Sequence, residues 1–113
     1  MERVYQVQTT TDSREGAEEL ARAVVDRRLA ACVQITGPLQ SVYRWEDAIQ
    51  VDEEWLLACK TTKSLSVKLQ EAITELHSYD VPEILMFTVE AGLGSYISWV
   101  AEETGQAPEG SAH

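Results

Sequence analysis

"EEWLLACKTTKSLSVKLQEAITELHSYDVPEILMFTV", residues 53–89, decides the fold because its hydrophobic pattern changes twice along its length. The first part, 53–61, is a nearly continuous apolar run, which is typical of a central β-strand. Apolar residues then recur at helical spacing until shortly before Pro82, which disfavours helix at the residue preceding it. A second apolar run, 84–89, predicts a buried strand. The stretch therefore predicts a strand, a helix, a short connection and another strand.

Two amphipathic helices are predicted. The helix inside this stretch begins near Thr62 or Ser64 and ends close to His77. An earlier helix follows Asp12 or Ser13, either of which can cap it, and glutamates fill its first turns, where the helix dipole favours negative charge. Each helix has one apolar stripe that can cover a sheet. The stripes are Ala17, Leu20, Ala21, Val24, Val25 and Leu29 in the earlier helix, and Leu65, Leu69, Ala72, Ile73 and Leu76 in the later one.

The remaining strands are predicted from alternating side chains and from residues that break regular structure. Residues 4–9 alternate enough to form a first strand. Residues 30–35 predict a short strand that Gly37 and Pro38 should stop, and extended structure resumes at 40–45. These segments supply the strands that the stretch 53–89 lacks.

The end of the chain is predicted to be helical and then irregular. A turn at 46–48 precedes the central strand. Farther along, Gly92 and Gly94 break the chain, and Ser95 can cap a short last helix. Residues 105–113 contain turn formers and no apolar anchor, so we expect a disordered tail.

The predicted order is β-α-β-β-α-β with a small helix added, which is the split βαβ arrangement of ferredoxin-like α+β domains. We expect one such domain over residues 1–104. Two helices on one face of an antiparallel sheet would bury both stripes. The other face lacks a cover, although the strands carry much apolar surface, so we expect oligomerisation. The residues concerned are Tyr43, Trp45, Trp55, Leu56 and Leu57.

Composition narrows the range of partners and compartments. Nineteen acidic against nine basic residues give a net charge of −10, which repels the phosphates of nucleic acids and anionic membranes. No apolar stretch reaches the ~18 residues of a membrane span, and "MERVYQVQTT" contains no signal segment, so we expect a soluble, cytoplasmic protein. Cys32 and Cys59 have apolar neighbours and no CxxC spacing, which predicts buried thiols rather than a disulfide or a zinc site.

Five segments carry a family resemblance through their order and spacing. They are RLAACVQI (28–35), SVYRWEDAI (41–49), EEWLLACKT (53–61), HSYDVPEIL (77–85) and GSYISWV (94–100). Together they resemble the CutA divalent-ion tolerance family along roughly Val4 to Glu103. The resemblance implies a ferredoxin-like subunit and a tight homotrimer in which long β-hairpins cross onto neighbouring subunits. It also implies a role tied to copper and other divalent metals, and kinship with the PII signalling trimers.

Some positions depart from the usual pattern of that family. Ser78 stands where the family usually has proline, which should loosen the exit of the helix, and Asp80 stands where it usually has glutamate. The residue after Glu46 is not the usual glycine. Gln8 lies near the place where certain relatives have a cysteine, so that strand supplies no thiolate ligand. This difference argues against a soft, cysteine-rich copper site.

His77, Asp80 and Glu83 lie close together on the predicted connection and form the candidate metal site. His77 would bind through a neutral imidazole with a carboxylate beside it, a combination that suits copper or zinc. Copper(II) is favoured because nitrogen and oxygen sites generally bind it most tightly among the first-row divalent ions. The alternatives for His77 are a helix-end residue that complements the dipole, and one member of an acid/base pair. Cys32 is a further candidate ligand, with packing in the core as its alternative.

The resemblance places Lys60 in a cleft between subunits, near Trp45, Tyr79 and the candidate metal residues, where it could bind an anion or hold a carboxylate. Considered on its strand alone, Lys60 is an edge charge that discourages sheet extension. Tyr43 and Trp45 are expected to be interface anchors, and a place in the cleft is their alternative role.

The chain has no nucleophile motif, oxyanion-hole signature, Gly-rich phosphate loop or HExxH, so we expect no enzyme. Two functional hypotheses remain. In the first, a trimeric intracellular protein binds divalent metal ions, copper above others, and takes part in tolerance of them. In the second, a PII-like sensor or scaffold trimer binds a small metabolite or a partner protein in its clefts, and metal is incidental.

Overall fold

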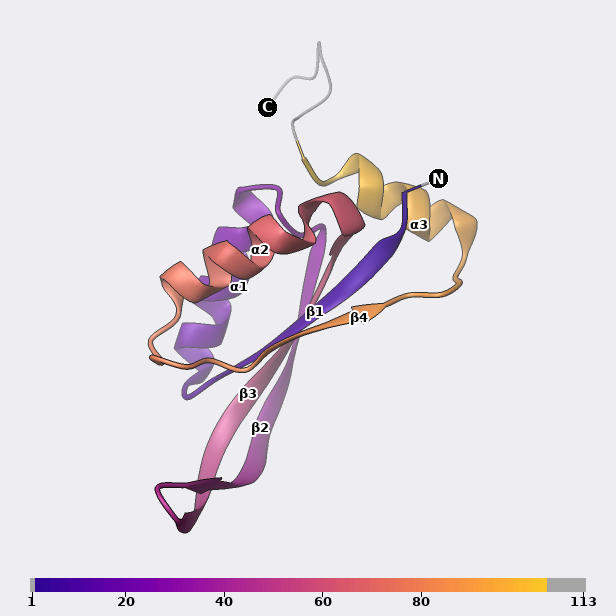
Figure 1. Cartoon of the computed structure of the whole chain (residues 1–113). Helices are drawn as coiled ribbons and strands as arrows, with labels where there is room; N and C mark the ends of the chain where they lie inside the picture. The colour runs from indigo at the N-terminus through magenta and orange to yellow at the C-terminus, as the bar shows by residue number, and fades with distance from the viewer. Residues whose placement is uncertain (1, 106–113) are drawn as a thin grey trace.

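The computed structural model describes residues 2–105, in which a four-stranded sheet carries two helices on one face and a third helix near one end (Figure 1). The strand order is β2-β3-β1-β4, and every neighbouring pair runs antiparallel. This confirms the ferredoxin-like α+β fold with an added C-terminal helix. The elements are β1 (Val4–Thr11), α1 (Arg14–Asp26), β2 (Cys32–Trp45), β3 (Ala48–Thr62), α2 (Lys63–Leu76), β4 (Ile84–Thr88) and α3 (Gly94–Glu102).

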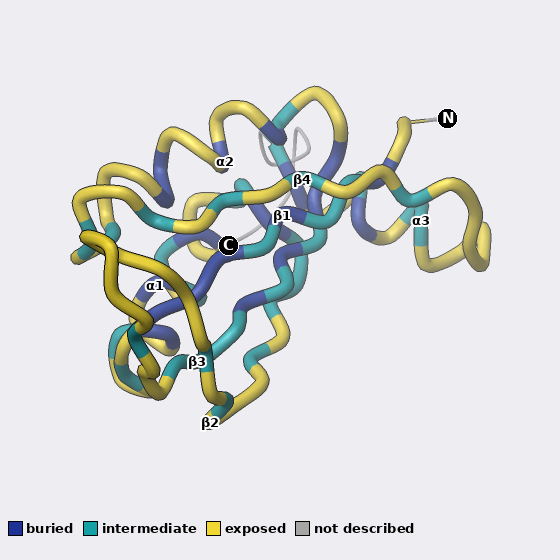
Figure 2. Tube along the Cα trace, turned by 60° about the horizontal axis from the view of Figure 1, so that its bottom comes forward, coloured by how far each residue is buried: buried dark blue, intermediate teal, exposed yellow. Residues whose placement is uncertain are grey.

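The core lies between the sheet and the helices α1 and α2. Val7 of β1 and Cys59 of β3 are paired and both buried, because directly opposed side chains in a sheet lie on the same face. Six of the eleven predicted stripe residues are buried, and Figure 2 colours the buried positions along the chain dark blue. Val25 and Leu76 belonged to those stripes but are exposed, and Leu29 lies beyond the end of α1. The fully buried helix residues include Ala17, Val24, Leu69 and Ile73.

The opposite face of the sheet is open in a single chain. Cys32, Lys60, Gln6 and Phe87 are successive partners across the four strands and form one row on this face. Leu85 and Phe87 of β4 are 49% and 46% exposed, so the prediction that this strand is buried is wrong for the single chain. The reason is that β4 is an edge strand with only one face covered.

β2 and β3 continue beyond the sheet as a long hairpin, so the molecule measures 53 × 29 × 22 Å (Figure 1). Glu46 and Asp47 form the predicted turn and have positive φ angles of 48° and 62°. Gly37 and Pro38 do not stop β2 as expected. A shift in the pairing with β3 absorbs these two residues, and the strand continues on the other side.

The ends of the helices match the predictions in part. Ser13 caps α1, and its hydroxyl accepts a backbone hydrogen bond at 2.9 Å. α3 has Leu93 at its N-cap instead of the expected Ser95, which lies inside the first turn. Of the segment predicted to be a tail, Gly105 is described and bonded to Arg28, whereas 106–113 lies outside the described residues.

Candidate functional site

His77 follows the last residue of α2, and two backbone groups hold its ring. Nε2 lies 2.7 Å from the carbonyl oxygen of Thr10 on β1. Nδ1 accepts a hydrogen bond from the backbone N–H of Tyr79 at 3.0 Å. Because a carbonyl can only accept and a backbone N–H can only donate, the neutral ring carries its proton on Nε2. The basic lone pair of the imidazole is therefore on Nδ1, where the Tyr79 amide covers it.

Tyr79 connects the same segment to β3. Its hydroxyl donates to the Glu54 carboxylate at 2.8 Å, and its ring centroid lies 4.8 Å from that of His77. Partial burial, and then the bond to Glu54, raise the pKa of Tyr79, so its hydroxyl stays protonated and donates at neutral pH. Thr10, His77, Tyr79 and Glu54 form a chain of contacts between β1, the end of α2 and β3. We call these four residues the latch.

The residues of the predicted metal site do not converge on one point in the single chain. Glu83 accepts a hydrogen bond from the Gln8 side chain at 2.9 Å, and Asp80 is exposed. His77 is occupied by the latch. Within residues 2–105, no group of three or more His, Cys, Asp or Glu side chains is placed to hold a metal ion. A site built on these residues needs a side chain to move or a ligand from another subunit.

Lys60 and Cys32 are direct partners on the open face. The Lys60 ammonium donates to the Gln34 side chain at 2.9 Å and forms no ion pair with any other described residue. Cys32 is partly exposed and lies against Tyr96, whose pKa is raised by burial and by this thiol. The prediction of buried thiols is thus right for Cys59 and wrong for Cys32. Burial in the core raises the pKa of Cys59 to about 12.

Tyr43 and Trp45 lie on the projecting part of the hairpin. Trp45 is next to the turn and 55% exposed, and the Tyr43 hydroxyl is hydrogen bonded to Asp52 on the opposite strand. Trp45 is the last residue of β2, and Cys32, which pairs with Lys60, is the first. A cleft that contains both Trp45 and Lys60 can therefore form only between subunits.

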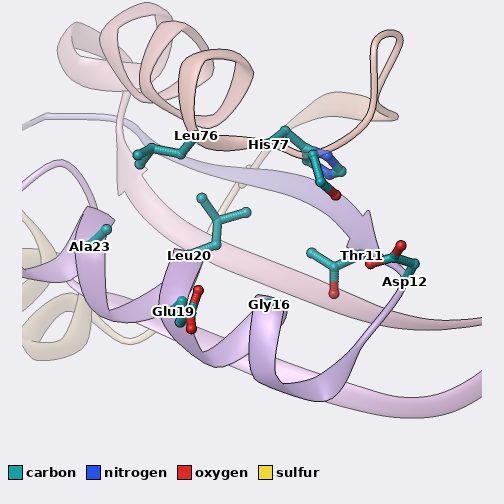
Figure 3. A pocket seen from close by; sticks show the side chains of 9 residues that line it. Thr11, Asp12, Gly16, Glu19, Leu20, Ala23, Leu76 and His77 are labelled. Carbon is teal, nitrogen blue, oxygen red and sulfur yellow. The ribbon is translucent and has the colours of Figure 1, made fainter.

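On the helix side of the latch, a cavity of about 200 Å³ lies between the start of α1 and the end of α2. Figure 3 shows Leu20 on α1 and His77 at the end of α2 on opposite sides of it. Asp12 and Glu19 line the cavity, and no Lys or Arg does. Ligand pockets usually measure about 300–1,000 Å³, so this cavity admits only a small group.

The fold and the site define a class of protein: a ferredoxin-like subunit with a long projecting hairpin and an uncovered sheet face. A family model described as CutA1 divalent ion tolerance protein matches residues 5–103. The chain belongs to this CutA family. The family consists of tolerance proteins and not of enzymes, which confirms the expectation from the missing catalytic motifs.

Individual relatives agree with this assignment. The divalent-cation tolerance protein CutA of Thermus thermophilus is 44% identical over 96 residues, which cover 85% of this chain and 93% of that protein. The solved structure of the Thermus thermophilus protein has a TM-score of 0.86 over 93% of this chain and 100% of that chain, again at 44% identity. The crystal structure of CutA1 from Ehrlichia chaffeensis has a TM-score of 0.90 at 30% identity, over 94% of this chain and 99% of that one.

The relatives differ in length and in the compartment that their names give. The chloroplastic CutA of Arabidopsis thaliana is 40% identical over 87% of this chain, which spans only 54% of that protein. A structure from Archaeoglobus fulgidus is described as periplasmic. Within residues 2–105, no helix is long and apolar enough to cross a membrane. Family membership is therefore compatible with more than one compartment.

The sequence indicated His77 and Tyr79 but not the groups that hold them. Thr10 lies 67 positions from His77, and Glu54 lies 25 positions from Tyr79. No local spacing relates these residues, because the packing of the end of α2 and the connection against β1 and β3 brings them together. The one signal for Glu54 is a carboxylate that directly precedes the apolar residues 55–59 within β3.

Proposed function

We propose that the chain works as a cytoplasmic homotrimer that binds divalent metal ions, with copper(II) favoured, and so takes part in tolerance of them. The observation that carries this proposal is membership of a family described by divalent-ion tolerance. The donors supplied by His77, Glu83, Asp80 and Cys32 support it, since copper(II) ranks highest among first-row divalent ions at nitrogen and oxygen sites. The net charge of −10 attracts cations to the surface.

Exposed apolar side chains support the trimer. In the single chain, Trp45 is 55% and Ile49 68% exposed, which is a large apolar area for the tip of a hairpin. The open sheet face and α3 expose further apolar groups. Hairpins that cross onto the open faces of neighbouring subunits would cover both surfaces at once. The residues of the two surfaces are Val42, Tyr43, Trp45, Ile49, Val51, Leu85, Phe87, Tyr96 and Trp99.

One ring nitrogen of His77 is arranged as in a metal-binding histidine, and the other is not free to bind an ion. A metal-binding histidine usually donates its other ring N–H to a carbonyl or carboxylate, and Nε2 of His77 has such a partner in Thr10. The nitrogen that would bind the ion, Nδ1, is hydrogen bonded to the Tyr79 amide. Glu83, Asp80 or Cys32 would complete the ligand set after a side-chain movement or from a neighbouring subunit.

Lys60 favours a second candidate function. Its ammonium lies on the open face beside the amide of Gln34 and has no carboxylate partner among the described residues. A cation in that position suits an anionic metabolite or an acidic peptide in an inter-subunit cleft, as in a PII-like sensor. Selective stabilisation of the protein by an anionic metabolite, with no response to metals, would favour this alternative.

Calorimetric titration with copper(II) tests the metal proposal on three forms of the protein. They are the full chain, a version ending at Gly105, which lacks the second histidine, His113, and that shorter version with His77→Ala. The shorter version should keep one site per subunit. His77→Ala should weaken binding at least ~10-fold, about 1.4 kcal/mol. Copper binding that disappears with the tail, or that survives His77→Ala unchanged, would contradict the proposal.

The cytoplasmic location is part of this proposal, and in that reducing compartment the partly exposed thiol of Cys32 would stay free of intermolecular disulfides. Fractionation of the source cells should recover the protein with cytosolic markers. Recovery with an extracytoplasmic fraction would contradict this part of the proposal and leave metal binding unaffected.

A further inference from the structure

We infer that the latch is a closed state which opposes metal binding at His77, so that coordination releases Tyr79 and loosens the connection between α2 and β4. This inference rests on the proposed metal function and describes its regulation. It follows from the position of the ring's basic lone pair. That lone pair is on Nδ1, where the Tyr79 backbone N–H covers it at 3.0 Å.

Only one side of the imidazole has to change for coordination. A neutral imidazole binds a metal through its lone pair, so the Tyr79 amide must leave Nδ1. The Nε2–H group can keep its bond to the Thr10 carbonyl at 2.7 Å, because that bond does not involve the lone pair. The ring therefore stays attached to β1, and the movement falls on the segment that begins at Ser78.

The side chain of Tyr79 is held in place as well as its amide. The hydroxyl is bonded to Glu54 at 2.8 Å, and the ring lies against His77. Glu54 pairs with Leu39, beside the shift in register where the hairpin leaves the sheet. Displacing the Tyr79 amide thus pulls on the base of the hairpin. The site that would bind the ion and the element that carries the exposed apolar surface are coupled through one side chain.

The coupling has a consequence that a purely structural tyrosine would not produce. A ligand that binds only the open state has its apparent affinity reduced by the fraction of molecules that are open. Weakening the latch raises that fraction. Deleting the Tyr79 hydroxyl should therefore strengthen metal binding, although it removes a contact from the protein.

The test compares copper(II) affinity in three variants of the chain ending at Gly105. Tyr79→Phe keeps the ring and the amide and removes the bond to Glu54, and we expect affinity to rise about 3- to 10-fold. Glu54→Gln keeps an acceptor without the charge and should give a smaller rise. Tyr5→Phe is the matched control, because it removes a tyrosine hydroxyl from β1, outside the latch and outside the proposed binding surfaces. It should leave the affinity unchanged.

Hydrogen exchange measured by mass spectrometry gives a second readout without metal. Amides in 78–83 should exchange faster in Tyr79→Phe than in the unsubstituted protein or Tyr5→Phe, and adding copper(II) to the unsubstituted protein should also speed them. Copper binding that is equal or weaker in Tyr79→Phe would overturn the coupling and leave the proposed function intact. Absence of copper binding in every variant would overturn the proposed function and the coupling with it.

Discussion

Arg28 and Gly105 hold each other through two hydrogen bonds that run in opposite directions. The Arg28 guanidinium donates to the Gly105 carbonyl at 2.8 Å, and the Gly105 N–H donates to the Arg28 carbonyl at the same distance. A second guanidinium nitrogen donates to the carbonyl of Glu102, the last residue of α3, at 2.8 Å. A positive charge at the carboxyl end of a helix also complements the helix dipole. The turn after α1 therefore fixes the end of α3.

Replacing Arg28 by asparagine should lower the free energy of unfolding by about 1–3 kcal/mol, because it removes hydrogen bonds from a charged donor. Asparagine is suitable because Arg28 has a φ of 58°, which asparagine tolerates better than most residues. The measurement is denaturant unfolding followed by circular dichroism. Arg27→Asn, at the exposed neighbouring residue, is the control and should change stability by less than about 0.5 kcal/mol. Equal losses in the two variants would contradict the role of the guanidinium.

Adding a methyl group at Gly37 should destabilise the protein by about 1–3 kcal/mol. A Cβ at this position would lie 2.5 Å from the Trp55 ring, which packs against the core from β3. Gly37→Ala should therefore displace the indole and change the tryptophan fluorescence. Gly94→Ala is the control, since a Cβ there meets nothing within 4 Å and alanine favours the helix that Gly94 begins. The argument fails if both variants melt like the unsubstituted protein.

The trimer should depend on the apolar side chains at the tip of the hairpin. Light scattering on a sizing column should give three times the 12.6 kDa mass of the chain. Trp45→Ala should weaken this assembly, since truncating an interface anchor can cost ~2 kcal/mol or more. Val67→Ala removes an exposed apolar side chain from α2 and should leave the mass unchanged. A monomeric parent protein would refute the proposed trimer.

Cys59 should make stability depend on pH in the alkaline range. Its thiol pKa is raised by burial from 9.0 to about 12, so between these values the unfolded chain loses a proton that the folded chain keeps. The contribution of the buried thiol to the free energy of unfolding is fully present below pH 9. It is lost as the pH rises toward 12, by up to about 1.4 kcal/mol per pH unit. Unfolding curves measured at pH 8 to 11 should show this decline in Cys32→Ala and a smaller decline in Cys59→Ala. Identical slopes in the two variants would refute it.

The sequence predicted the order of elements because its main signals are local. Ser13 caps α1 through its own hydroxyl, and Pro82 restricts the residue directly before it; α1 begins after Ser13, and α2 has ended before Pro82 is reached. Gly37 and Pro38 are also local signals, and the prediction that they stop the strand is wrong. The strand continues because β3 pairs with β2 on both sides of them, which a local signal does not contain. Whether a strand such as β4 is buried depends on what covers its face, which a local pattern does not contain.

The candidate site shows the same limit. The spacing of His77, Tyr79 and Glu83 marked the connection after α2, and the structure shows contacts from all three to other strands. Sequence proximity did not make the acidic residues converge with the imidazole, because the connection bends at 78–81 and the Glu83 carboxylate is bonded to Gln8 instead. The contacts with Thr10 and Glu54 depend on the tertiary packing that brings the end of α2 and the following connection to β1 and β3.

Cys32 and Cys59 are one position out of register on neighbouring strands, so their side chains leave opposite faces of the sheet. Two cysteines whose side chains point apart cannot be bridged without moving the backbone. Oxidation therefore cannot form a disulfide between β2 and β3, and Cys59 is buried in the core. In the single chain, the only thiol of the pair open to covalent chemistry is Cys32, and a disulfide formed there would join two molecules. In an oxidised preparation, a non-reducing gel would show covalent pairs of chains and no internally cross-linked monomer.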